Sequence, residues 1–232
     1  MSRRTPPAHA AAPRRRGAPE PVRPPQFVLP ALHPYTGPLE PEGDYDGLRF
    51  HGLDLSGGHG PGARFLDCGL YGVTLDEAGL RGARFTDCAL HAVRGVGTDL
   101  ADAQLRDVEL RDARFGGAQL HGAALTRVAF RGGKLDFLNL RTARLTDVAF
   151  ENCVLTEPDF GGARLTRVTF SGCVVRDADL TSATLADVDL RGCAELGLAR
   201  GLDRLSGAVV SPAQLMDLAP ALAAQLGVRV LG

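Results

Sequence analysis

The chain has 232 residues, of which 44% are hydrophobic, and a formal net charge of −1. This length and apolar content predict one domain with a sizeable core and exclude a wholly disordered chain. No run approaches the ~20 apolar residues of a membrane span, and no excess of charge selects a class of partner.

Cysteine usage and the N-terminal sequence predict the compartment. The five cysteines include no C-x-x-C pair, a pattern more typical of a reducing compartment than of a disulfide framework. The basic N-terminus has no apolar secretory segment. We therefore expect a cytoplasmic protein with no membrane partner.

The N-terminal 45 residues are rich in proline. Residues 1–41 hold 11 of the 15 prolines, and proline lacks the N–H that helices and central strands need. We predict that residues 1–25, with six arginines and one acid, form a disordered, basic, Pro/Ala-rich tail. We expect such a tail to be a solvated linker; the alternatives are weak binding to nucleic acid through its arginines and recognition of its prolines by a groove-bearing partner. Residues 26–45 are expected to pack as an irregular N-terminal cap.

Residues 46–194 repeat with a period of five. Leu, Phe or Val occupies 27 of the 29 positions that are multiples of five between Phe50 and Leu190, the exceptions being Gly60 and Gly95. The position two residues earlier is small, usually Ala, Val or Cys. The predicted structural core includes Phe65, Phe85, Leu105, Phe130, Phe150, Phe170 and Leu180.

A period of five fits neither a helix nor a flat strand. Five steps rotate a helical side chain by about 140° and move a strand side chain to the opposite face. Side chains five apart share an interior only if the backbone turns a corner every five residues. Four corners close a coil of about 20 residues, so the sequence predicts an all-β, four-sided parallel β-helix of about seven coils.

The outward positions carry mixed charge. One row is moderately acidic and reads Asp99, Gln119, Asn139, Asp159 and Asp179. Two other rows are basic and read Arg94, Arg114 and Lys134, and Arg64, Arg84, Arg144 and Arg164. Phe137 also falls at an outward position, where an exposed aromatic anchors a partner or is simply solvated. The partner-surface candidates are therefore Asp99, Asp159, Asp179 and Phe137.

The sequence offers no convincing catalytic, metal or cofactor site. The cysteines fall in the inward small column, where Cys is a good core residue; a metal or disulfide ladder of Cys153, Cys173 and Cys193 is the alternative. Outward histidines such as His91 and His121 sit on different sides without a positioned nucleophile. Because nearly every inward position is apolar, no polar pocket is expected, and we predict that the chain is not an enzyme.

Residues 195–232 leave the repeat and predict a helical cap. Ser211-Pro212-Ala213-Gln214 reads as a capping box with proline at the first helical position. The leucines that follow recur at steps of three and four and so share one face. They are Leu215, Leu218, Leu222 and Leu226. Pro220 is expected to kink or restart this helix, and Gly227 to end it.

The repeat resembles the pentapeptide-repeat family, whose motif is A-(D/N)-L-x-x, over about residues 46–194. The resemblance implies a right-handed quadrilateral β-helix that docks on a protein partner. The best-understood members protect or inhibit DNA gyrase, a type II topoisomerase, by mimicking duplex DNA. The unbroken register and the C-terminal module are similar to the mycobacterial-type fluoroquinolone-resistance proteins of the family.

Two interpretations of function follow from this resemblance. One is a DNA-mimicking modulator or protector of gyrase; the other, favoured by the mixed charge, is a general interaction scaffold with an unrelated partner. The resemblance also implies that the C-terminal module caps the rod and pairs two copies as a homodimer, with a cap that forms no dimer as the alternative.

Overall fold

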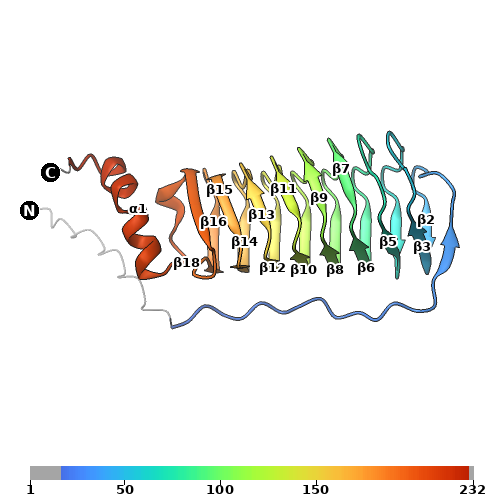
Figure 1. The fold of residues 1–232 in the computed structure, drawn as a ribbon, viewed down its shortest axis with the longest axis horizontal. Coiled ribbons are helices and arrows are strands. Elements are labelled where there is room, and N and C mark those ends of the chain that lie inside the picture. Colours follow the sequence, from blue (N-terminus) through green and yellow to red (C-terminus); the bar gives the residue numbers. More distant parts are fainter. Residues whose placement is uncertain (1–16, 230–232) are drawn as a thin grey trace, which may run out of the picture.

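The computed structural model describes residues 17–229, which form a rod of stacked coils with one helix at its C-terminal end (Figure 1). The predicted parallel β-helix is confirmed. It has about eight turns rather than about seven, because residues on both sides of the expected repeat add strands to it.

Two parallel sheets wrap the rod. The 12-stranded sheet contains β1 (His33–Tyr35), β2 (Asp44–Asp46), β3 (Leu48–His51), β4 (Arg64–Leu66), β5 (Gly69–Tyr71), β6 (Arg84–His91), β8 (Gln104–Arg111), β10 (Ala124–Arg131), β12 (Arg144–Glu151), β14 (Arg164–Ser171), β16 (Thr184–Asp189) and β18 (Ala208–Val209). The 6-stranded sheet contains β7 (Arg94–Val96), β9 (Arg114–Gly116), β11 (Lys134–Asp136), β13 (Val154–Thr156), β15 (Val174–Asp179) and β17 (Glu195–Arg200). A short 3-10 turn, η1 (Leu202–Arg204), and the helix α1 (Pro212–Gln225) complete the chain.

The coil has four sides, each centred on one inward residue. In the coil that starts at β10 these residues are Leu125, Phe130, Leu135 and Leu140, all buried. We name the sides 1 to 4 in this order. The long strands bend around a corner and cover sides 1 and 2, and the 6-stranded sheet forms side 3. On side 4 the coils up to residue 179 are joined by single bridges, such as the one from residue 119 to residue 139, and β15 and β17 continue the 6-stranded sheet onto this side at the C-terminal end.

The corners explain how a five-residue period closes. In the same coil the corner residues Arg127, Gly132, Phe137 and Thr142 have φ of 52°, 68°, 53° and 56°. A non-glycine residue in this left-handed region costs about 1 kcal/mol. The corner N–H groups offset that cost by bonding to the next coil, as the Phe137 N–H does to the carbonyl of Thr156 at 2.8 Å.

The interior is the continuous column that the repeat predicts. The seven core residues proposed from the sequence are all buried. The rings of Phe130, Phe150 and Phe170 stack with centroids 4.7 and 4.8 Å apart, close to the spacing of neighbouring strands. Parallel pairing places Phe150 directly between the other two.

The two glycine exceptions are each filled by another residue. Leu39 lies against Gly60, where its Cβ would be 3.2 Å from a Cβ added to the glycine, and it is itself buried. Thr98 occupies the space beside Gly95, and its hydroxyl donates to the Leu75 carbonyl at 2.8 Å. The interior space next to Gly60 and Gly95 is therefore filled by the side chains of Leu39 and Thr98.

The N-terminal segment departs from the prediction. Residues 17–32, which we call the strap, run extended along the outside of the rod from its C-terminal towards its N-terminal end (Figure 1). A disordered tail was expected through residue 25, but residues 17–25 lie on the rod, where a buried acid accepts a strap N–H. The part of that prediction on residues 1–16 lies outside the described residues. The expected irregular cap at 26–45 contains β1 and the start of β2.

The C-terminal end also differs from a purely helical cap. β17 and β18 continue the two sheets, and Leu196, Leu198 and Leu205 pack on the core. α1 begins with the predicted capping box and runs unbroken through Pro220 to Gln225. Residues 228–229 belong to neither a helix nor a strand, and residues 230–232 lie outside the described part.

Candidate functional site

The acidic row lies on side 4, where its members help to build the coil. Asp159 and Asp179 each accept the backbone N–H two residues later, at 2.8 and 2.7 Å, and Asp99 does so at 3.0 Å. This bond explains the acid or amide before the central residue of the motif. Between these acids the amides are also paired, with Asn139 Nδ2 donating to Gln119 Oε1 at 2.7 Å.

Each acid of this row also faces an arginine. The three ion pairs are Arg81 with Asp99 at 3.4 Å, Arg141 with Asp159 at 3.1 Å, and Arg200 with Asp179 at 3.5 Å. Burial opposes ionisation of Asp179, but its bonds to Thr181 and the nearby Arg200 outweigh burial and lower its pKa. Because each of the three acids faces an arginine, the row presents little uncompensated negative charge.

Side 1 carries basic residues without such compensation. Arg64 pairs with Arg84 and Arg144 with Arg164 in adjacent strands, so two arginine pairs are stacked one coil apart. All four are exposed, and none forms an ion pair within residues 17–229. Like charges directly opposite each other destabilise a sheet, and the stacked arginines leave exposed positive charge on this side.

Phe137 is an exposed aromatic on the rod. It stands at the corner between sides 3 and 4 and is 56% exposed. On side 3, Arg114 is exposed, and Val96 is 64% exposed. The structure thus places Phe137 at the border between a side with basic residues and the side of the acidic row.

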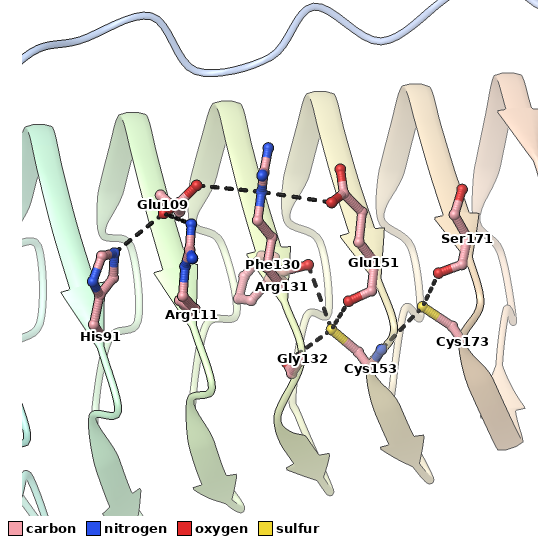
Figure 2. A network of polar contacts seen from close by, with 10 residues as sticks. All are labelled: His91, Glu109, Arg111, Phe130, Arg131, Gly132, Glu151, Cys153, Ser171 and Cys173. Carbon is pink, nitrogen blue, oxygen red and sulfur yellow. Dashed lines mark hydrogen bonds and ion pairs between the residues drawn. The ribbon is translucent and has the colours of Figure 1, made fainter.

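A charged network crosses the coils on side 2. Figure 2 shows His91, Arg111 and Arg131 around Glu109, with contacts of 3.1, 3.0 and 3.2 Å. Arg131 also lies 3.5 Å from Glu151. Burial opposes ionisation of Glu109, but the bond from Arg111 and the charges around it lower its pKa. His91, one of the outward histidines, is part of this network.

The corner between sides 1 and 2 carries alternating charge under the strap over residues 107, 127, 147 and 167. Arg127 makes two bonds to Asp107, with Nε to Oδ1 at 2.7 Å, and Arg167 makes two to Asp147, with Nε to Oδ1 at 2.7 Å. The bonded arginines lower the pKa of both carboxyls against the opposing effect of burial. These four residues, the corner row, were missed by sequence reasoning. Opposite charges 20 residues apart were the signal that could have revealed them.

The cysteines lie inside the rod as core residues. All five are free thiols, and only Cys193 is not fully buried. Burial raises the pKa of Cys68 to about 11 and that of Cys193 to about 12, so both stay protonated near neutral pH. The Cys153 thiol donates to the Gly132 carbonyl at 3.1 Å (Figure 2). Within residues 17–229 no three metal-ligating side chains cluster.

The leucines of α1 do not form one buried face. Leu218 is 7% exposed, whereas Leu215 is 50% and Leu226 is 80% exposed, and Leu222 is half-buried. Met216, not predicted, is 73% exposed.

The start of α1 is fixed to the rod, because Gln214 Nε2 donates to the Leu190 carbonyl at 2.8 Å. Beyond that contact the helix leaves an apolar surface uncovered by the rest of residues 17–229. No helix in the described part of the chain is long and apolar enough to cross a membrane.

Comparison with known proteins identifies the repeat. The family model for the pentapeptide repeat region matches residues 63–140 and 143–196. A trypsin-treated variant of QnrB1, a plasmid-mediated fluoroquinolone resistance protein, is 20% identical with a TM-score of 0.50, covering 89% of this chain and 100% of that one. HetL is a pentapeptide repeat protein involved in heterocyst differentiation regulation in the cyanobacterium Nostoc sp. It is 21% identical with a TM-score of 0.35, and the match covers 72% of this chain and 90% of HetL. No curated protein sequence matches the chain.

Proposed function

Because this chain belongs to the pentapeptide repeat family, we propose that it is a non-enzymatic binding protein that docks on a protein partner along the outer sides of its rod. The observation that carries this proposal is the interior, where the central column is filled by packed apolar side chains. Chemistry that recognises a partner is therefore confined to the outward rows and the corners.

The first candidate partner is a type II topoisomerase, DNA gyrase. Its support is the family resemblance and the regular stacking of the coils between β6 and β16. A DNA-shaped protein competes for a basic groove through its negative charge, and the acids available for this are Asp99, Asp159 and Asp179.

A supercoiling assay with purified gyrase and a quinolone tests this candidate. The protein should inhibit supercoiling or protect it from the drug at micromolar concentration. Replacing the three acids by asparagine keeps their bonds to the backbone and should weaken the effect, whereas Asp54→Asn, on side 3, should not. No effect of the unmodified protein on supercoiling or on drug action would refute gyrase as the partner.

The second candidate is a partner with an acidic surface that docks on side 1. The uncompensated arginine pairs favour it, because their mutual repulsion is relieved when an anionic surface approaches. Arg144→Gln with Arg164→Gln should slow association and reduce its salt dependence. Arg141→Gln, in an ion pair on side 4, is the matched control. If the unmodified protein binds gyrase and the Arg144→Gln, Arg164→Gln variant binds gyrase equally well, docking through side 1 is wrong.

We also propose that two copies pair through α1. The support is the exposure of three large apolar side chains at this end, Leu215, Met216 and Leu226, within residues 17–229. Monomeric proteins rarely leave large contiguous apolar patches exposed. Pairing at this end would place two rods end to end and double the length of the docking surface.

A further inference from the structure

The strap is attached to the corner row through two backbone donors. The Gln26 N–H donates to Asp107 Oδ1 at 3.1 Å, and the Arg23 N–H donates to Asp147 Oδ1 at 3.2 Å. Each acceptor is itself fixed by an arginine of the corner row. The two carboxylates are among the few charged groups buried in the rod, at 6% and 3% exposed. The strap is therefore bound by preorganised acceptors.

The spacing of these acceptors matches one conformation of a peptide. Asp107 and Asp147 are two coils apart, which is about 9.6 Å at the strand spacing. Three residues of polyproline II helix, the step from Arg23 to Gln26, span about 9.3 Å. The intervening Arg127 has no acceptor to offer an N–H, so the two acceptors that hold the strap stand two coils apart. The corner row thus selects a chain with a donor at every third residue.

The prolines of the strap are placed in agreement with this register. Proline has no N–H, and the strap prolines nearest the two donors stand at 21, 24 and 25. The half-buried residues Pro19, Val22 and Pro25 also recur at every third position, which is the period of polyproline II. One edge of the strap, formed by these three residues, therefore packs on the rod, while the neighbouring Arg23 and Gln26 N–H groups bond to the carboxylates of the corner row.

The surface under this edge is apolar although it faces outward. Ala129 and Ala149 are 1% and 7% exposed, and they lie on side 2 outside the inner core. Together with Pro19, Val22 and Pro25 they line a cleft of about 440 Å³ whose other wall is charged. Small residues let the strap approach closely, and the remaining cleft shows that it does not fill the groove.

We propose that this groove is a binding site for proline-rich segments in polyproline II conformation, and that a segment of a partner protein binds there by displacing the strap. The strap is suited to displacement because residues 17–32 include no fully buried residue. Its third contact is weak, since Glu20 is exposed and lies 3.9 Å from Arg167. As a tethered occupant it competes at high effective concentration, so it also excludes weak ligands.

Binding of a labelled peptide with the sequence of residues 17–32 to the full chain tests this proposal. Arg23→Pro with Gln26→Pro removes both donors of the strap and keeps a proline-rich segment. Because a hydrogen bond to a charged acceptor contributes about a factor of ten or more, this variant should bind the peptide at least about tenfold more tightly than the unmodified chain. The same peptide with methyl groups on the Arg23 and Gln26 nitrogens should bind at least about tenfold more weakly.

A substitution in the groove separates this site from other surfaces. In the strap-released variant, Asp147→Gly removes an acceptor at a corner whose φ of 57° suits glycine, and it should abolish tight binding. Asp177→Gly, at the opposite corner between sides 3 and 4 with φ of 53°, should leave binding unchanged. Equal affinity for the unmodified and strap-released chains, no binding to either, or tight binding to the Asp147→Gly variant would each overturn the proposal.

Discussion

Truncating Phe150 to alanine is expected to remove much of the stability of the rod. The ring is fully buried and lies between those of Phe130 and Phe170, with centroids 4.7 and 4.8 Å away. A buried Phe→Ala change costs about 3–5 kcal/mol. The two stacked contacts, each about 0.5–1.5 kcal/mol beyond area burial, favour the upper end. Against a total stability of about 5–15 kcal/mol, the loss is large.

Denaturant unfolding followed by circular dichroism measures this loss, with Phe137→Ala as the matched control. Phe137 is 56% exposed at a corner, so its truncation should change the free energy of unfolding by no more than about 0.5 kcal/mol. Phe150→Leu should recover most of the stability, because leucine occupies the same column in other coils. Equal effects of the two alanine variants would refute the assignment of Phe150 to the interior and Phe137 to the surface.

Three further predictions concern the strap and α1. In amide exchange followed by NMR, the Arg23 N–H should exchange more slowly than that of Val28; equal rates would contradict the bond to the rod. Acid should release the strap, because the pKa of Asp147 is lowered in the folded state. The stability that the ionised Asp147 contributes is present above the unfolded-state pKa of about 3.9 and is lost as the pH falls from there through the lower folded-state pKa. Strap NMR signals that stay unchanged through that range would count against this. Leu215→Glu with Met216→Glu should convert a dimer to a monomer in light scattering, and an unmodified chain that is already monomeric would exclude the dimer.

The core could be predicted from the sequence because its determinants are local. The position of a residue within its five-residue unit decides whether its side chain points inward. Side chains five apart share an interior only if the backbone turns a corner in every unit. Phe65, Phe85 and Leu105 were assigned to the interior on that ground, and they are buried. The compensation at Gly60 was not predictable, since it depends on where the cap places Leu39.

The surface was less predictable because its contacts join distant residues. Asp99, Asp159 and Asp179 were correctly placed on one side, but their neutralisation depends on arginines from other positions. The strap was missed because prolines exclude helix and central strand without specifying the alternative. Its position depends on acceptors such as Asp147, which bonds to the Arg23 N–H across 124 residues of sequence.

Ring-to-ring NOEs between phenylalanines test most directly the claim that residues one coil apart stack in a common interior. Phe150 should show NOEs to both Phe130 and Phe170, consistent with centroids 4.7 and 4.8 Å away, and Phe137 should show none to these three rings. Absence of both NOEs from Phe150, or NOEs that join it to Phe137, would contradict the four-sided coil and the outward surfaces derived from it.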